Sequence, residues 1–220
     1  MDERDAEPCC YAGEYQKLFG RRRAARGAKA YRRKGLAASA RRLVDGLVAG
    51  DVTGLSVLEV GGGVGAIQAE LLAAGAERAT NVDLSPEWEA EAAGLIAEQG
   101  LDGRVERRVG DFVTIAHDIP AADVVVLHRV VCCYPDWRGL LGRATSKAMT
   151  AVALTFPRDR WPTRLTLGLE NLLRRIRGQE FRAFVHPARA MLELVQDAGF
   201  EITSDTSDMV WRSVVLHRAA

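Results

Sequence analysis

The chain has 220 residues, a formal net charge of +1 and a hydrophobic content of 48%, which is typical of one globular domain with a sizeable core. No apolar run reaches the roughly 18 residues that a membrane-spanning helix needs, so we expect no membrane span. The first five residues are acidic and polar, unlike a secretory signal, and we therefore expect a cytoplasmic protein.

Residues 1–50 are expected to form an N-terminal helical cap of two segments, 14–33 and 35–49. Ten basic residues and no acid lie between Arg21 and Arg42. This run fits either a nucleic-acid-binding surface or the solvated face of a helix. The second is favoured because few aromatic residues are interleaved for base stacking. A basic helix beside an active site would also attract an anionic substrate.

Residues 51–220 predict an α/β core with a doubly wound, mostly parallel, seven-stranded sheet. The clearest central strand is 122–128, whose residues 124–127 form an uninterrupted apolar run that is typical of a strand buried on both faces. The other strands are expected at 55–60, 78–83, 104–109, 148–156, 201–206 and 210–217, and the core helices at 64–74, 86–99, 136–147 and 191–197. The last two strands fit an antiparallel hairpin that closes the sheet.

Residues 157–187 interrupt this alternation and are expected to form an inserted helix after the fifth strand. Apolar residues and arginines recur there at helical spacing: Trp161, Leu165, Leu169, Leu172, Leu173 and Ile176, with Arg164, Arg174, Arg175 and Arg177. The pattern fits a lid over the carboxyl edge of the sheet, which would exclude water from a reaction site. It fits a homodimer interface or surface packing almost equally well.

The most informative segment is the glycine loop Gly61-Gly62-Gly63-Val64-Gly65, between a predicted strand and a predicted helix. Glycines allow positive φ and let a ligand touch the main chain, and the following helix offers unpaired N–H groups. Such a loop holds a nucleotide-like cofactor at the carboxyl end of a parallel sheet. Because Gly61-x-Gly63-x-x-Ala66 also fits the dinucleotide fingerprint, the glycines alone do not identify the cofactor.

Three acids at strand ends favour a nucleoside with an ammonium group. Glu59, two residues before the loop, would reach the ammonium directly or through water. Asp83 closes the next strand and would accept both ribose hydroxyls. Asp111 follows the third strand and would accept from an adenine amino group, with the Phe112 ring beside it.

A nicotinamide cofactor is disfavoured because the chain lacks the catalytic features that such a cofactor usually accompanies. That reading predicts a catalytic partner domain or a Tyr-x-x-x-Lys pair. The residues four positions after Tyr31 and Tyr134 are Gly35 and Arg138, so neither tyrosine begins such a pair.

The acid, the glycine loop and the two further acids, each at a strand end, resemble the class I S-adenosylmethionine-dependent methyltransferases, whose first motif is E/D-x-G-x-G-x-G. The resemblance implies a Rossmann-like methyltransferase fold, S-adenosyl-L-methionine as cofactor and S-adenosyl-L-homocysteine as product. It implies cofactor contacts from Glu59, Gly61, Gly62, Gly63, Gly65, Asp83, Leu84, Asp111, Phe112 and His128.

A closer resemblance links the chain to the magnesium-protoporphyrin O-methyltransferase branch and to small methyltransferases of actinobacterial type. It is carried by residues 15–20 (YQKLFG), the Tyr134-Pro135 turn and residues 182–186 (RAFVH). The chain departs from the porphyrin enzymes at Phe19, where they carry a tyrosine, and at Cys133, where they carry a histidine. Since the resemblance implies catalytic roles for those two positions, the fold and cofactor carry over, but the porphyrin substrate and its mechanism do not.

The segment 128–135 follows the fourth strand and is expected to lie against the cofactor. His128, Tyr134 and His186 are candidates for proton transfer or substrate positioning, because an O–H, N–H or S–H nucleophile needs a base whereas a carboxylate does not. A hydrogen-bonded histidine at a strand end is an equal alternative for His128. Tyr15, Phe19, Arg129 and Cys133 are candidate substrate contacts, with Arg129 as a clamp for an anion.

The four cysteines form two adjacent pairs, Cys9-Cys10 and Cys132-Cys133. Neither pair has the C-x-x-C spacing of a zinc site, so no metal site is predicted. A metal or redox site built from both pairs requires the N-terminus to fold over the sheet. Small packing residues are the favoured reading.

These observations predict a single-domain methyltransferase that acts on a small molecule, of the kind found in natural-product metabolism. Two alternatives remain: an RNA-directed methyltransferase or nucleic-acid-binding protein that uses the basic N-terminal helices, and a non-catalytic S-adenosylmethionine-binding protein. A homodimer is compatible with the sequence.

Overall fold

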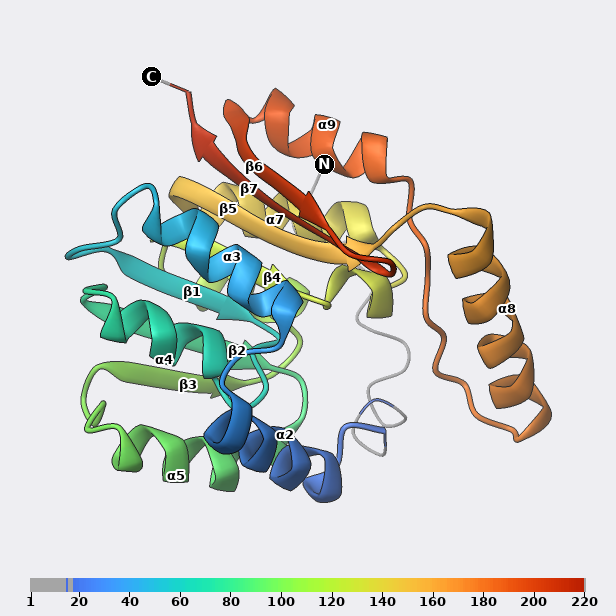
Figure 1. Ribbon diagram of the computed structural model, residues 1–220, viewed down its shortest axis with the longest axis horizontal. Coiled ribbons are helices and arrows are strands. Elements are labelled where there is room, and N and C mark those ends of the chain that lie inside the picture. The colour runs from blue at the N-terminus through green and yellow to red at the C-terminus, as the bar shows by residue number, and fades with distance from the viewer. Residues whose placement is uncertain (1–14, 16–17, 220) are drawn as a thin grey trace.

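One seven-stranded sheet organises the chain (Figure 1). The computed structural model describes Tyr15 and residues 18–219. The strands are β1 Ser56–Val60, β2 Arg78–Asp83, β3 Val105–Val109, β4 Ala122–His128, β5 Ala148–Pro157, β6 Phe200–Ser207 and β7 Trp211–Arg218. They lie in the order β3-β2-β1-β4-β5-β7-β6, with β7 antiparallel to both β5 and β6 and the other pairs parallel. The predicted doubly wound sheet and closing hairpin are confirmed.

Helices cover both faces of this sheet. They are α2 Arg21–Lys34, α3 Ala38–Val48, α4 Ala66–Ala73, α5 Glu89–Glu98, α6 Phe112–Ile115, α7 Trp137–Lys147, α8 Trp161–Ile176 and α9 Ala188–Asp197, with the short 3-10 turns Pro86–Trp88, Ala116–Asp118 and Val131–Cys133. One hydrophobic core lies under α6, α7 and α9, and a second lies under α3 and α4 on the opposite face. Two apolar layers therefore hold the strands rigidly in place.

Polar caps fix where several helices begin. The Ser85 hydroxyl accepts from the Glu87 N–H at 3.4 Å, ahead of the first-turn proline Pro86. The carboxylates of Asp111 and Asp136 accept from backbone N–H groups at the starts of α6 and α7. Each cap satisfies a backbone N–H that the first helical turn leaves without an intrahelical partner.

Two predicted helices differ from the observed ones. The cap helix predicted over 14–33 is interrupted: Tyr15 and Leu18 are helical, but Gly20 is extended and precedes α2. The helix predicted over 86–99 starts as a 3-10 turn and becomes α-helical only at Glu89. Gly20 sets the first of these boundaries, since glycine is costly within a helix.

The chain reverses its winding between β1 and β4, which are neighbours in the sheet. Helices that follow these strands leave toward opposite faces, so a crevice opens at the carboxyl ends of the two strands. The glycine loop follows β1, and Arg129 follows β4. The topology thus brings two of the predicted site segments to one place.

Helix α8 stands apart from this layered body (Figure 1). None of its residues is buried. The segment that returns from α8 to α9 runs between α8 and the sheet. The inserted helix after the fifth strand is therefore present, on the side of the molecule where the strands end.

Candidate active site

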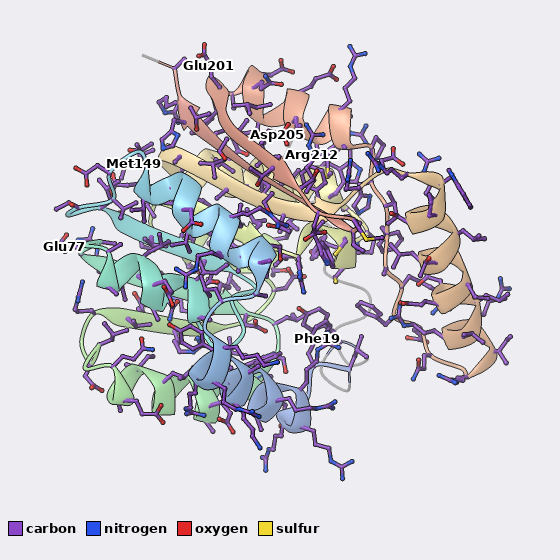
Figure 2. All side chains as sticks on the ribbon, viewed as in Figure 1. Phe19, Glu77, Met149, Glu201, Asp205 and Arg212 are labelled. Carbon is purple, nitrogen blue, oxygen red and sulfur yellow. The ribbon has the colours of Figure 1, made fainter. Side chains whose placement is uncertain are left out.

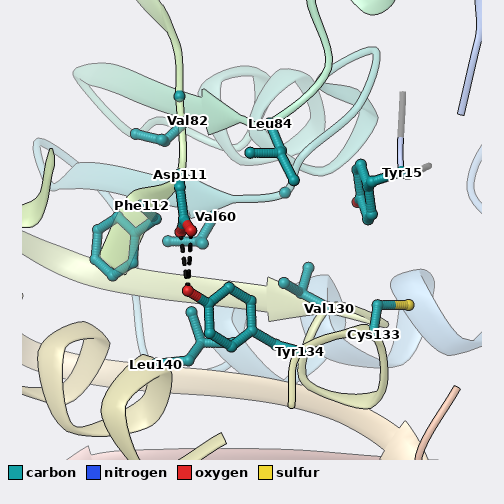
Figure 3. A pocket seen from close by; sticks show the side chains of 12 residues that line it. Tyr15, Val60, Val82, Leu84, Asp111, Phe112, Val130, Cys133, Tyr134 and Leu140 are labelled. Carbon is teal, nitrogen blue, oxygen red and sulfur yellow. Dashed lines mark hydrogen bonds between the residues drawn. The ribbon is translucent and has the colours of Figure 1, made fainter. Parts of the chain in front are cut away.

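A cavity of about 810 Å³ opens at the carboxyl ends of the strands. The glycine loop, the segment after β4, the N-terminal residues Tyr15 and Phe19, and the inner side of α8 line it. A narrower pocket lies beside it and shares Tyr15, Gly61, Val130 and Cys133 with it (Figure 3). The size is in the range of small-molecule and cofactor sites.

The glycine loop forms the floor of the cavity. Gly61, Gly63 and Gly65 have φ values of 66°, 57° and 79°, which side-chain-bearing residues rarely adopt. A Cβ on Gly61 would also lie 2.5 Å from the Val130 side chain. Gly61, Gly62 and Gly63 line the cavity. A ligand can therefore approach their main chain closely.

Glu59 lies behind this loop and is not among the residues that line the cavity. One Glu59 carboxylate oxygen accepts from the Gln68 N–H at 3.2 Å, near the start of α4, and the Gln68 side chain accepts from the Asn81 amide at 3.0 Å. Burial raises the pKa of Glu59 to about 8. The geometry makes Glu59 a support for the loop. Sequence analysis missed Gln68 and Asn81, since buried amides carry no motif.

Asp83 faces the cavity at the end of β2. Its carboxylate accepts from the Gly63 N–H and from the Ser85 N–H, both at 2.9 Å. Burial raises the pKa of Asp83 above its ordinary value. A carboxylate has about four acceptor positions, so Asp83 can hold the loop and still accept from a ligand hydroxyl.

The narrow pocket beyond Asp83 is mostly apolar, with Leu84 and Val130 in its walls (Figure 3). The Tyr134 hydroxyl lies 3.0 and 3.1 Å from the two carboxylate oxygens of Asp111, to which it donates. Asp111 also accepts from the Val113 N–H at 3.0 Å. The Tyr134 ring thus closes the pocket beside Asp111. Such a slot suits a flat heterocycle that offers an N–H group to the carboxylate.

A second group of side chains lies at the end of β4. The Arg129 guanidinium donates to the Ser39 hydroxyl at 2.9 Å, and the same oxygen lies 3.0 Å from Nε2 of His128. Because arginine can only donate, the Ser39 proton is free to go to His128, which then carries its own proton on Nδ1. Burial, with a smaller contribution from Arg129, lowers the pKa of His128 to about 3, so the imidazole is neutral.

Arg129 is held in an unusual geometry. Its φ is 59°, and its guanidinium lies over the Trp211 ring at 4.3 Å from the centroid. Its Nε is buried without a hydrogen-bond partner among the described residues. Burial lowers the pKa of Arg129 from its usual value. Because Arg129 lines the cavity and a guanidinium binds carboxylate and phosphate groups, Arg129 is a candidate contact for an anionic ligand.

Aromatic rings and two further arginines form the outer wall. Phe19 stacks on Tyr15 with centroids 4.2 Å apart and meets the Phe181 ring edge-on at 6.1 Å. Arg23 lies over Phe19 and Arg174 over Phe181. Phe19 is located at the N-terminal end of α2, on the side toward α8 (Figure 2). The cap and the insertion thus meet here, through a residue, Phe181, that sequence analysis did not single out.

Cys133 lines both cavities, with its Sγ 3.8 Å from that of Cys132. The Cys132 hydrogen bond lowers the pKa of Cys133, aided by Arg23 and Arg174, whereas the pKa of Cys132 is raised. Cys9 and Cys10 lie outside the described residues. Within the described part of the chain, no cluster of three or more potential metal-ligating side chains occurs.

His186 lies behind the 131–134 turn rather than in the cavity. Its Nε2 is 3.1 Å from the Val131 carbonyl oxygen and 3.0 Å from that of Tyr134, so this nitrogen carries the proton and donates. The Phe184 ring stacks on it. His186 therefore ties the insertion to the turn that carries Cys133 and Tyr134.

Comparison with known proteins decides the family. Residues 24–205 match the family model described as a methyltransferase domain, which is most of the chain. The chain belongs to the methyltransferase domain family. It has the fold of the class I S-adenosylmethionine-dependent methyltransferases, whose cofactor is S-adenosylmethionine.

Solved structures show the same fold. The magnesium protoporphyrin IX methyltransferase of Synechocystis, with bound S-adenosylhomocysteine, is 22% identical over 94% of this methyltransferase and 99% of that chain, with a TM-score of 0.73. An O-methyltransferase family protein from Burkholderia thailandensis is 20% identical, and the match covers 99% of this methyltransferase and 66% of that chain, with a TM-score of 0.70. An O-methyltransferase family 2 protein from Planctomyces limnophilus, in complex with apigenin, is 19% identical, and the match covers 89% of this methyltransferase and 62% of that chain, with a TM-score of 0.66. No curated protein matches the sequence.

Half of the ten basic residues between Arg21 and Arg42 pair with acids or face the cavity. Four arginines pair with acids on other elements: Arg21 with Glu87, Arg32 with Glu98, Arg41 with Glu70 and Arg42 with Asp208. Arg23 faces the cavity. A nucleic-acid surface needs cations that are available to phosphates, and pairing with acids removes these four arginines from that role. Among the described residues, no helix is long and apolar enough to cross a membrane.

Proposed function

We propose that this methyltransferase transfers a methyl group from S-adenosylmethionine to a small aromatic acceptor that carries an anionic group. The observation that carries the proposal is the position of Arg129: it lines the same cavity as the glycine loop and the aromatic residues of the outer wall, with its guanidinium over the Trp211 ring. The cavity combines a nucleoside-type site with a cationic, aromatic compartment. An acceptor of that chemistry matches both the charge and the surface.

The residues present fit the cofactor. Gly61 and Gly63 line the cavity, Asp83 has acceptor capacity for ribose hydroxyls, and the narrow pocket beside Asp111 is mostly apolar. When bound, S-adenosylmethionine would supply an electrophilic methyl group on a sulfonium. Glu59 would support cofactor binding without touching the cofactor, by keeping the loop and the start of α4 in place. The protein's part in such an in-line transfer is mainly alignment.

The site offers little basic catalysis, which favours an acceptor that is already nucleophilic. Nε2 of His128 is engaged with Ser39, and a pKa near 3 makes the imidazole a poor base at neutral pH. The Tyr134 hydroxyl donates to Asp111, and His186 lies outside the cavity. We therefore assign His128 and Tyr134 to positioning, and His186 to holding the 131–134 turn.

The cap and the insertion would enclose the acceptor. Residues 1–50 contribute Tyr15, Phe19 and Arg23 to the wall, and 157–187 contribute the inner side of α8 and Phe181. We assign the first segment as a cap and the second as a lid on the 51–220 core. Closure over a bound acceptor would remove water and strengthen the interaction of Arg129 with an anion.

An acceptor panel tests this function. Release of S-adenosylhomocysteine is measured with aromatic carboxylic acids and with their neutral amides, for the wild type, Arg129→Gln and the control Arg138→Gln, whose side chain lies on Trp137 rather than in the cavity. We expect turnover of acids but not amides. Loss of a charge-assisted contact should raise the KM for the acid by about tenfold or more in Arg129→Gln alone. Equal turnover of acids and amides would contradict the proposal.

A further inference from the structure

Helix α8 has one side that the methyltransferase site does not use. At about 100° per residue, Pro162, Thr166 and Glu170 share the inner side and line the cavity. A neighbouring side of the helix carries an apolar stripe formed by Trp161, Leu165, Leu169, Leu172, Leu173 and Ile176, all exposed and none of them among the residues that line the cavity. Trp161 is 76% exposed and Ile176 is 73% exposed. The stripe is therefore solvent-facing and is separate from the wall of the cavity.

This exposure is concentrated rather than scattered. Of the twelve large hydrophobic side chains that are exposed in the described part of the chain, six belong to the apolar stripe of α8. Isolated exposed apolar residues are normal on a protein surface, but a contiguous apolar patch marks an interaction site. A sixteen-residue helix is about 24 Å long. It is too short to cross a bilayer and long enough to lie flat on one.

The charged residues around the apolar stripe indicate which kind of partner would bind it. Seven arginines and three acids between residues 158 and 182 leave this insertion with a net charge of +4. Arg160, Arg175 and Arg177 are exposed and form no salt bridge with any described residue. A second copy of the chain would bring the same positive charge against itself. An anionic surface would be attracted, and arginines beside an apolar face with a tryptophan are typical of interfacial helices.

We propose that α8 docks this protein on an anionic lipid membrane, with its apolar stripe inserted at the boundary between headgroups and acyl chains. Arg160, Arg175 and Arg177 would lie at the level of the lipid phosphates. Because the inner side of the same helix lines the cavity, docking would place the cavity beside the membrane surface, where amphiphilic acceptors collect. The proposal does not depend on methyl transfer.

Vesicle binding by the full-length protein tests the proposal. Sedimentation is measured with vesicles of phosphatidylcholine alone and of phosphatidylcholine with phosphatidylglycerol, at low and high salt. The variant Leu165→Gln/Leu169→Gln/Leu172→Gln removes the centre of the stripe. The control Met149→Gln changes a residue that is 48% exposed on the side of the molecule away from α8 (Figure 2). Wild type and control should bind the anionic vesicles, more weakly at high salt, and the triple variant should bind at least about tenfold more weakly.

Two results would overturn the proposal: no binding of the wild type to anionic vesicles, or binding that the triple variant retains. Dimerisation of the wild type without vesicle binding, seen by analytical ultracentrifugation and lost in the triple variant, would assign the stripe to a second copy instead. Binding of S-adenosylhomocysteine by the triple variant serves as its folding control. If that variant does not fold, the fluorescence of Trp161, isolated by comparison with Trp161→Phe, must shift to the blue on anionic vesicles only; absence of that shift also overturns the proposal.

Discussion

The carboxyl group of Glu59 is buried away from solvent, and this burial changes its pKa. It lies beneath the glycine loop, where burial raises its pKa to about 8, well above the value of an unfolded chain. At pH values above the pKa of Glu59 in the unfolded chain and below its pKa in the folded protein, the folded protein holds a proton that the unfolded protein has released. The free energy of unfolding therefore falls as the pH rises through this window, and the contribution of Glu59 is favourable only at the acidic end.

A neutral isostere should remove this pH dependence. Glu59→Gln keeps an acceptor for the Gln68 N–H but cannot ionise. We expect the variant to match the wild type near pH 5 and to be more stable near pH 8, by an amount that grows by at most about 1.4 kcal/mol per pH unit. Urea unfolding of both proteins across this range measures the difference. Parallel pH profiles would show that Glu59 is ionised in the folded protein.

His128 should stay neutral well below neutral pH. Burial holds its pKa near 3, and Ser39 supplies a donor for its Nε2. In NMR spectra of protein labelled at histidine, the His128 ring, assigned with His128→Asn, should show no protonation on going from pH 7 to pH 5. An unfolded chain would protonate this residue near pH 6.5, so His128 stabilises the fold less as the pH falls below that value. Protonation near pH 6 in the folded protein would refute the assignment.

The glycine loop is the element on which cofactor binding depends most. A Cβ on Gly62 would collide with the Asn81 amide and with Glu59, both buried. Gly62→Ala should therefore displace the loop and weaken binding of S-adenosylhomocysteine by about tenfold or more, while overpacking lowers the free energy of unfolding by about 1–3 kcal/mol. Isothermal titration and thermal melting measure both effects.

Gly168→Ala is the control for Gly62→Ala, because it makes the same substitution outside the glycine loop. Gly168 lies within α8, and a Cβ there would meet nothing within 4 Å. Alanine in a helix interior is favoured over glycine by about 0.5–1 kcal/mol, so this variant should keep its affinity and melt at the same temperature or higher. Equal affinities of Gly62→Ala and Gly168→Ala would mean that the loop is not a contact surface for the ligand.

Elements with a strong local signal could be predicted from the sequence. Strand 122–128 is observed with the predicted bounds, because its central residues 124–127 are apolar and buried. The break at Gly20 was missed because the flanking residues are good helix formers, and a single glycine in a helical pattern does not by itself end a helix. Helix α6 was missed because four residues are too few to display a helical period.

At the scale of the whole molecule, the acceptor side of the site could not be predicted. Ser39 meets His128, 89 residues away, and Trp211 meets Arg129 because the antiparallel pairing of β7 with β5 sets it opposite Pro157, at the carboxyl end of the sheet. Such contacts depend on sheet order and register, which no short motif encodes. The cofactor side was predictable because its glycine loop and acids each end a strand, and parallel strands end at one edge. The ligand contacts of the individual residues remain predictions.

The most direct test of the account is calorimetric titration of the purified protein with S-adenosylhomocysteine. The comparison variant is Asp83→Asn, in which the carboxylate that holds Gly63 and faces the cavity is replaced by an amide. The control is Asp197→Asn, at the exposed end of α9. We expect micromolar binding by the wild type and the control, and at least about tenfold weaker binding by Asp83→Asn, because charge-assisted hydrogen bonds to the ribose would be lost. Absence of binding to the wild type would contradict the account.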